Sequence, residues 1–200
     1  MIDEFERALG DDPETGAAVN AVMAPHAGWH YSGATAWAAL RRAASPAIER
    51  LVLFGGHLAP GDAPVLVETD AWRTPIRDIE MDSQTINRLK ESFPGVIETD
   101  RRYRRDNGIE LVLALAVHAF PNASLVAIGA PPIGKSISLG HNVAAALDDR
   151  SRTIFIASTD LTHYGPNYGF SPRGAGPAAL TWVSDENDAD FIDAVRAADS

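Results

Sequence analysis

Apolar runs of strand length alternate with longer helical patterns along this chain, and this alternation constrains its fold more than any other feature. The strand-like runs occupy residues 20–25, 50–56, 64–69, 124–130 and 152–159. The helical patterns occupy residues 33–44, 82–93, 107–120, 135–149 and 185–199. Strands separated by helices are typical of parallel sheets, because each parallel crossover needs a long connection. We therefore predict an α/β fold with a mostly parallel, mixed central sheet and helices on both faces.

Several local features refine this prediction. The run at 64–69 is the candidate for an antiparallel strand. Asp82 and Ser32 are predicted to cap the helices that follow them, because Asp and Ser oxygens accept hydrogen bonds from first-turn N–H groups. The glycines and proline within residues 25–33 favour a loop before the helix. The dense charge run at 100–106 is typical of a solvated loop.

Composition limits the class of protein. The 200 residues suit one domain, and 46% hydrophobic residues are enough for a sizeable core. A net charge of −10 and a pI near 4.9 argue against partners such as nucleic acid or an anionic membrane surface. The absence of cysteine excludes disulfides and thiolate ligands within the chain. The acidic start lacks the apolar segment of a signal peptide and no run reaches the roughly 20 residues of a membrane span, so we predict a cytoplasmic protein.

Three of the six histidines follow predicted strands. His26 and His57 come directly after the first and second strand-like runs, and His163 follows the last one together with Asp160. Ligands of open α/β sheets bind beyond the carboxyl ends of the strands. We expect these three strands to be neighbours or near-neighbours, so their histidines would meet at one edge of the sheet.

These residue types suit a metal centre. Neutral imidazole is the commonest protein ligand for transition metals, and two histidines with a third ligand leave positions for a substrate or dioxygen. A further histidine beside the metal suits general acid/base chemistry, because its ordinary pKa lies near neutrality, and Asp160 would orient it. The plainer alternatives stay open. A single histidine at a strand end is commonly a hydrogen-bonded loop residue, and Asp160 also suits a helix cap or turn.

The other three histidines are not assigned to the site. His118 lies in the apolar pattern of residues 107–120 and is expected to be structural. His141 lies within a predicted helix and is expected at its surface. His30 follows His26 by four residues, the spacing of two ligands on one helical face, but the expected loop there argues against that role.

Four segments carry a family resemblance: APHAGWHYSG, GGH, DNGIELVLALAVHAFPNASLVAI and IASTDLTHYG. In order and spacing they resemble the Memo-like family, whose bacterial and archaeal members are called AmmeMemoRadiSam system protein B. That family is similar in fold to class III extradiol ring-cleaving dioxygenases, in which two histidines and a third ligand hold a non-haem iron. The resemblance implies that His26 and His57 are metal ligands, that His163 is the acid/base group, and that Asp160 is its neighbour.

The chain departs from the family pattern in two places. Many members have Glu-His-Ser where this chain has Asp106, Asn107 and Gly108. The family's third metal ligand is usually a C-terminal cysteine, and this chain has none. We therefore expect residues 1–200 to be a single α/β domain that lacks its C-terminal part and, with it, the third ligand.

Three functions are compatible with these observations. The first is an extradiol-dioxygenase-like enzyme that uses iron(II), the expected ion, to bind a small substrate together with dioxygen. The second is a metal hydrolase, with zinc lowering the pKa of a bound water; copper is a further alternative ion. The third is a non-catalytic protein that binds a peptide or partner in the same pocket. The family name also suggests a functional association with a radical-SAM protein and an AMMECR-type protein.

Overall fold

The computed structural model describes residues 1–10, 19–100 and 106–198. Contacts within the chain fall into two compact units, Met1–Thr159 and Asp160–Ser200. The larger unit contains the central sheet, and the smaller one contains helices and a long loop. The single-domain organisation stays a prediction. Most of the charge run at 100–106, predicted as a solvated loop, lies outside the described residues.

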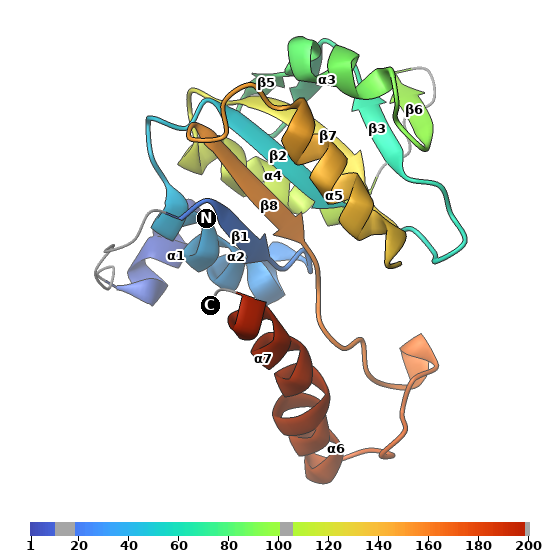
Figure 1. The fold of residues 1–200 in the computed structure, drawn as a ribbon. Coiled ribbons are helices and arrows are strands. Elements are labelled where there is room, and N and C mark those ends of the chain that lie inside the picture. The colour runs from blue at the N-terminus through green and yellow to red at the C-terminus, as the bar shows by residue number, and fades with distance from the viewer. Residues whose placement is uncertain (11–18, 101–105, 199–200) are drawn as a thin grey trace. The chain divides into compact units, whose positions relative to one another are not determined.

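A six-stranded sheet in the order β1-β8-β2-β7-β3-β6 forms the centre of the larger unit (Figure 1). Its strands are β1 (Ala21–Ala24), β2 (Arg50–Gly55), β3 (Val65–Glu68), β6 (Val96–Thr99), β7 (Ser124–Gly129) and β8 (Thr153–Ser158). Strands β1, β8, β2 and β7 are parallel, whereas β3 is antiparallel to β7 and parallel to β6. The predicted mixed sheet is therefore confirmed, with β8 between β1 and β2.

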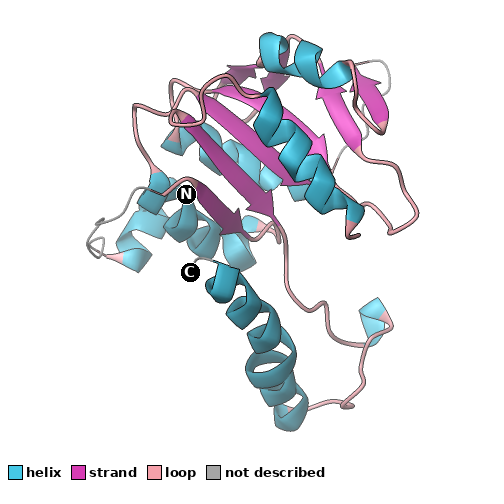
Figure 2. Ribbon diagram, viewed as in Figure 1, coloured by secondary structure: helices cyan, strands magenta, loops and turns pink. Residues whose placement is uncertain are grey.

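Helices cover both faces of this sheet, as predicted. Figure 2 shows α5 (Lys135–Ala146) in front of the sheet and α4 (Asn107–Ala119) behind it. Helix α2 (Trp29–Ala43) packs against α4, α3 (Ser83–Lys90) packs against α5, and α1 (Ile2–Leu9) packs against α2. Helix α4 is apolar nearly all round because it is buried on most sides.

The core lies between these helices and the central strands. Strands β2, β7 and β8 are buried along most of their length, which explains why they read as continuous apolar runs rather than alternating ones. Leu53, Ile128 and Ile154 are fully buried in them. These three strands therefore form a rigid base for the residues that follow their carboxyl ends.

The start of α2 corrects the expected loop over residues 25–33. The helix begins at Trp29, with Gly28 rather than Ser32 at its N-cap, and the Ser32 hydroxyl donates to the Ala27 carbonyl instead (2.8 Å). Gly33 lies inside the helix. It is a glycine because a Cβ at this position would come within 2.4 Å of the Phe5 ring of α1. This glycine therefore reflects close helix packing and not a loop.

Asp82 caps α3 as predicted. Its carboxylate accepts a hydrogen bond from the Thr85 backbone N–H (3.0 Å), which satisfies one of the first-turn donors of the helix.

A small antiparallel hairpin, β4 (Ala71–Arg73) and β5 (Asp78–Glu80), lies outside the central sheet and was not evident from the sequence pattern. Arg77 in its turn donates to the carbonyls of Phe120 and Pro121, just after α4, at 3.3 and 2.9 Å. The hairpin is therefore attached to the C-terminal end of α4.

The smaller unit contains α6 (Pro177–Trp182), the π-helical segment Val183–Asn187 and α7 (Asp188–Ala198). Helical structure thus starts before residue 185, where the sequence pattern placed it. The aromatic rings of Tyr164, Phe170 and Trp182 lie 6.0–6.2 Å apart and pack the preceding loop on α6. None of the helices in the described part of the chain combines the length and apolar character needed to cross a membrane.

Candidate functional site

His26 follows the end of β1 and is 7% exposed. Its Nδ1 lies 3.0 Å from the Oγ of Ser158, the last residue of the neighbouring strand β8. The Ser158 hydroxyl is also hydrogen-bonded to the carbonyl of Gly108, in the first turn of α4. His26 is therefore fixed by a chain of hydrogen bonds that joins β1, β8 and α4.

His57 follows the end of β2 through a tight turn. Gly56 has a φ of 92°, a backbone conformation that residues with a Cβ rarely adopt, and it directs the chain away from the sheet. The side chain of His57 is 49% exposed. Its ring centroid lies 4.9 Å from that of His26, with an interplanar angle of 75°. The structure thus brings these two predicted site residues together, because β1 and β2 both flank β8 in parallel.

Asp106 holds His57 in place. One carboxylate oxygen accepts a hydrogen bond from the His57 backbone N–H (2.7 Å), and the other lies 2.8 Å from His57 Nδ1. Asp106 also caps α4 by accepting from the Gly108 N–H (2.7 Å). Burial alone would raise the pKa of Asp106, but the hydrogen bonds from His57 and Gly108 outweigh it and lower the pKa below its ordinary value. Asp106 is therefore a carboxylate at neutral pH.

These contacts fix which ring nitrogen carries the proton. Ionised Asp106 only accepts hydrogen bonds, so His57 Nδ1 must donate to it. The single hydroxyl hydrogen of Ser158 is donated to the Gly108 carbonyl, which cannot itself donate, so His26 Nδ1 donates to Ser158 Oγ. In the neutral form, both histidines therefore carry their lone pair on Nε2.

The hydrogen-bond network also requires a glycine at the end of β2. A Cβ on Gly55 would lie 2.7 Å from the Gly108 carbonyl oxygen and 3.2 Å from the Ser158 Cβ. Only glycine lets β2 approach the first turn of α4 closely enough for Ser158 and Asp106 to contact their partners.

His57 and Asp106 line a cavity of about 390 Å³. Its walls also contain Val67 of β3, Trp72 of β4 and Glu98 of β6. This volume is within the range of cavities that hold small molecules. The candidate site therefore combines an oriented histidine with room for a small ligand.

Asp160 and His163 lie in the smaller unit. His163 Nε2 is 3.4 Å from a carboxylate oxygen of Asp160, and its ring centroid is 4.9 Å from that of Tyr168. Asp160 therefore contacts His163 in the way expected of an orienting residue, and the acid/base role of the pair stays a prediction.

The donor chemistry of His26 and His57 fits a divalent metal ion. Metal-binding histidines usually donate their other ring N–H to a carboxylate or another oxygen, as both residues do here. Across residues 1–10, 19–100 and 106–198, no group of three or more His, Cys, Asp or Glu side chains is arranged to hold a metal. The pair is thus a partial ligand set, and its role as ligands stays a prediction.

Sequence reasoning missed Asp106 and Ser158 as supports of the two histidines. An aspartate directly before an apolar helical pattern is a helix-cap signal, and it marks Asp106. No local signal marks Ser158, because its role depends on the position of β8 between β1 and β2. The unassigned histidines are exposed: His30, His118 and His141 all lie at the surface, and His118 contacts the Trp37 ring at 5.4 Å.

Replacing Asp106 by asparagine is expected to reverse the tautomer of His57. The Asp106 carboxylate accepts three hydrogen bonds, whereas an asparagine side chain has one acceptor oxygen and one N–H₂ group. The Nδ1 atom of His57 would therefore lose its acceptor in part or in full. Ring ¹⁵N chemical shifts would report the change. Asp62→Asn is the matched control, because Asp62 lines the same cavity but its carboxylate accepts from the Ala59 N–H rather than from a histidine ring. Unchanged His57 shifts in Asp106→Asn would contradict the assignment.

Taken together, these features define an α/β protein with two oriented histidines at the carboxyl edge of a mostly parallel sheet. A family model described as "Memo-like protein" matches residues 1–200, and the chain belongs to this family. The chain is 30% identical to a MEMO1 family protein of Pyrococcus horikoshii over 191 residues, which cover 90% of this chain and 65% of that relative. It is 27% identical to the "Protein memo-1 homolog" of Caenorhabditis elegans over 165 residues, covering 80% of this chain and 47% of the relative.

The match covers only part of these relatives. A MEMO1 family protein of Caldivirga maquilingensis is 28% identical over 156 residues, which are 74% of this chain and 55% of the relative. The chain thus spans about half to two thirds of the length of the curated relatives it matches. The activity of a whole Memo-like protein is therefore a matter for proposal.

Proposed function

We propose that His26 and His57 bind one divalent metal ion through their Nε2 atoms, in a mononuclear redox centre of a Memo-like protein. The observation that carries the proposal is the pair of Nδ1 hydrogen bonds, to Ser158 and to Asp106, which leaves the lone pair on Nε2 in both rings. Iron(II) is the expected ion, with zinc or copper as alternatives, because imidazole suits all three. A third protein ligand is expected from the remainder of the full-length protein.

The metal ion and the residues around it have distinct roles in this proposal. Bound iron(II) would supply redox chemistry toward dioxygen and a small substrate, whereas bound zinc would supply a water of lowered pKa. Asp106 orients the His57 ring by accepting from its Nδ1, and Ser158 orients the His26 ring in the same way. His163 is proposed, on the sequence motif, to hold or move a proton, with Asp160 orienting it.

The proposal is tested by metal analysis of the full-length protein purified without oxygen. We expect close to one metal ion per chain in the unaltered protein and a sharp loss in His26→Ala and in His57→Ala. His141→Ala is the matched control, because it removes an exposed histidine from α5 and should leave the metal content unchanged. Thermal melting of each variant separates loss of metal from loss of the fold.

The possible outcomes distinguish the candidate functions. Iron with substrate-dependent oxygen uptake supports the dioxygenase-like enzyme, and zinc with hydrolysis supports the metal hydrolase. Absence of metal from the full-length protein favours the non-catalytic protein that binds a peptide or partner. Full metal retention in both histidine variants would place any metal elsewhere and contradict the proposed site.

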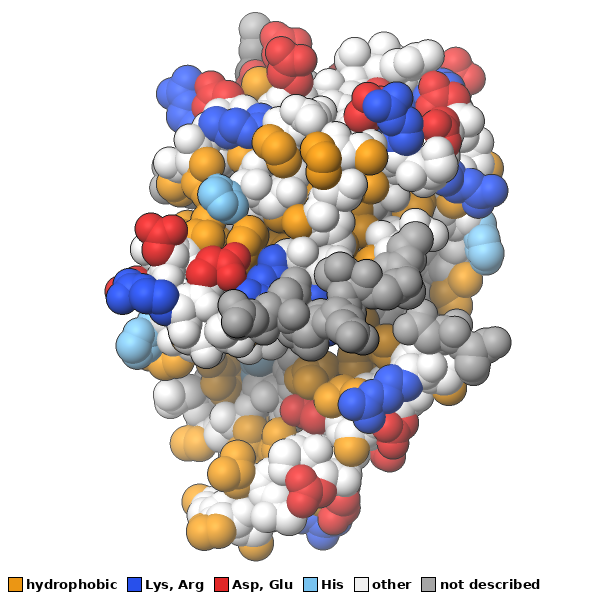
Figure 3. Space-filling model, turned by 90° about the vertical axis from the view of Figure 1, so that its left-hand side faces the viewer, with side chains coloured by type: hydrophobic (Ala, Val, Ile, Leu, Met, Phe, Trp, Pro, Cys, Tyr) orange, Lys and Arg blue, Asp and Glu red, His pale blue; other side chains and the backbone are white. Residues whose placement is uncertain are grey.

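The charge of the chain indicates which classes of ligand and partner it binds. On the face shown in Figure 3, Lys and Arg side chains lie among Asp and Glu side chains, and the whole chain carries a net charge of −10. This distribution supports a small molecule or peptide as ligand rather than nucleic acid. Cytoplasmic location and association with radical-SAM and AMMECR-type proteins belong to the same proposal.

A further inference from the structure

The cavity that contains His57, the His57 cavity, adjoins a second one of about 530 Å³ that contains Trp29, the Trp29 cavity. Val65 of β3 lines the His57 cavity. Thr69, the residue after β3, lines the Trp29 cavity, and Val67 between them lines both. Alternate residues of a strand point to the same face, so the two cavities lie in a row on one side of β3. Helix α4 also contributes side chains to both cavities.

Two side chains separate the cavities. Of the residues that the structure describes, only Val67 and Trp72 line both. Both are buried. Val67 pairs with Glu98 of β6 in the central sheet, and Trp72 pairs with Ile79 across the β4–β5 hairpin. A side chain that lines two cavities lies between them, so these two residues form a wall, the Val67–Trp72 wall.

The fold holds the Trp72 side of this wall in place. Ile79, opposite Trp72 in the hairpin, is fully buried. The hairpin turn is closed by the Thr74 hydroxyl, which donates to the Arg77 carbonyl (2.7 Å). The Arg77 side chain donates to two carbonyls just after α4 and so attaches the hairpin to that helix. Trp72 is therefore a fixed boundary of the His57 cavity.

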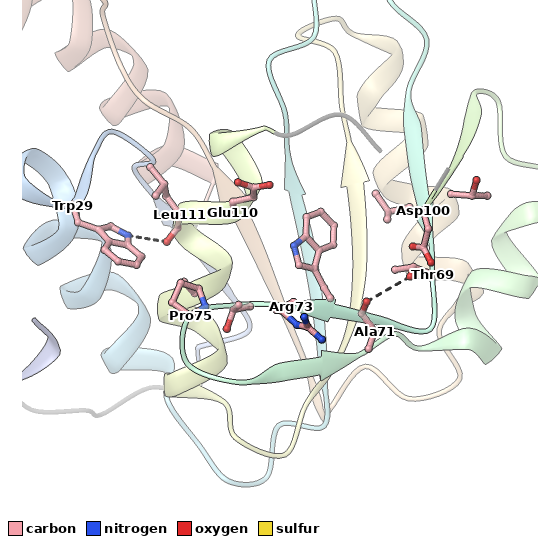
Figure 4. A pocket seen from close by; sticks show the side chains of 13 residues that line it. Trp29, Thr69, Ala71, Arg73, Pro75, Asp100, Glu110 and Leu111 are labelled. Carbon is pink, nitrogen blue, oxygen red and sulfur yellow. Dashed lines mark hydrogen bonds between the residues drawn. The ribbon is translucent and has the colours of Figure 1, made fainter. Parts of the chain in front are cut away.

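The Trp29 cavity also has a lining that the His57 cavity lacks. The Trp29 indole N–H donates to the Leu111 carbonyl (3.0 Å) on one side of it, and Thr69 lies on the opposite side (Figure 4). None of these three residues lines the His57 cavity. Truncation of Trp29 therefore enlarges the Trp29 cavity alone, whereas truncation of Trp72 opens the wall between the two.

We propose that Trp72 determines the size of the ligand that the His57 cavity accepts, by closing it off from the Trp29 cavity. Leu58 and Ile109 line the His57 cavity beside Trp72, so the part of the ligand that meets the wall is a compact apolar group. A longer apolar group is excluded, because a packed interior leaves little room for the indole to move aside. This inference rests on the proposed role of the His57 cavity as the ligand site and adds the side chain that limits the ligand.

A series of 1-alkanols from butanol to decanol measures this limit in the metal-free full-length protein. The ring signals of His57 and the indole N–H signal of Trp29, followed by NMR, report binding in the two cavities separately. Each buried methylene strengthens binding about fourfold. We expect affinity at His57 to rise with chain length and to level off where the chain reaches Trp72. In Trp72→Ala the rise should continue for at least two more carbons, which is roughly tenfold tighter binding of the longest alkanols, and both cavities should then report one dissociation constant.

Trp29→Ala is the matched control, because the chemical change is the same but Trp29 lines only the Trp29 cavity. Its length limit at His57 should equal that of the wild type. Trp72→Leu keeps a smaller apolar side chain and should give an intermediate limit, and it decides the matter if thermal melting shows that Trp72→Ala does not fold.

Three results would overturn the proposal: an unchanged limit in the folded Trp72 variants, the same shift in Trp29→Ala, or no alkanol binding at His57. Alkanol binding requires no metal. A negative metal analysis therefore leaves a measured length limit valid, and an unchanged limit leaves the metal proposal intact.

Discussion

Replacing Ile154 by alanine is expected to lower the free energy of unfolding by about 2–5 kcal/mol. Ile154 is fully buried in β8, which lies between β1 and β2 in the sheet. The substitution removes three carbon atoms from a site where helices pack on the sheet and leaves a cavity that the rigid central strands cannot close. Urea unfolding, followed by circular dichroism, measures the change.

Ile137→Ala provides the matched control for this prediction. The chemical change is identical, but Ile137 is 69% exposed on α5. Alanine is the better helix former, so the expected change is within about 0.5 kcal/mol of zero. If the two variants lost the same stability, β8 would not be at the centre of the core.

The sequence was sufficient to predict β1, β2, β3, β7 and β8, whereas the edge strand β6 was missed. Burial on both faces gives the central strands a strong signal. Strands such as β2 and β8 are nearly continuous apolar runs, and few other elements have that length and composition. The hairpin β4–β5 was missed because its strands have three residues each and only their central residues, Trp72 and Ile79, are buried. Such short patterns cannot be distinguished from loops before the packing is known.

The candidate site was predictable in part for a related reason. Parallel strands end at one edge, so the neighbourhood of His26 and His57 followed from strand order, which the structure confirms. The residues that orient them could not be derived in the same way. Ser158 and Asp106 contact histidines 132 and 49 residues away in the chain, and those pairings depend on three-dimensional register. The start of α2 was missed because glycine was read as a loop signal, although Gly33 makes room for Phe5.

Asp82 connects α3 to the start of β2, at the end of that strand opposite His57, and this arrangement determines its contribution to stability. Its carboxylate caps α3 through the Thr85 N–H and also accepts from the Thr85 hydroxyl (2.7 Å). Arg50, at the start of β2, forms a direct ion pair with it. The side chains of Arg50 and Asp82 are 15% and 9% exposed, so water screens this pair far less than a surface pair.

Replacing Asp82 by alanine is therefore expected to lower the free energy of unfolding by about 2–4 kcal/mol. The change removes a helix cap, worth about 1 kcal/mol, and leaves Arg50 partly buried without its closest carboxylate. The remaining contacts of Arg50 with Asp148 (3.2 Å) and the Asp149 carbonyl (3.1 Å) keep the cost below that of a wholly isolated charge. Asp78→Ala is the matched control, because its ion pair with Arg73 is exposed and should contribute less than about 1 kcal/mol.

The same carboxylate predicts a specific loss of stability in acid. Burial by itself raises the pKa of Asp82, but hydrogen bonds from Thr85 and the charge of Arg50 outweigh it, and the pKa in the folded protein lies below its ordinary value. A group whose pKa is lowered by folding stabilises the protein fully above its unfolded pKa of about 3.9, and this contribution disappears as the pH falls through the folded pKa.

Asp82→Asn keeps an oxygen for the cap but cannot ionise. The difference in unfolding free energy between wild type and Asp82→Asn should therefore be constant from pH 7 to about 5 and shrink below about pH 4. Asp106, whose pKa is also lowered, is present in both proteins and cancels from this difference. A difference that stayed constant down to pH 3 would show that the Asp82 charge does not stabilise the fold.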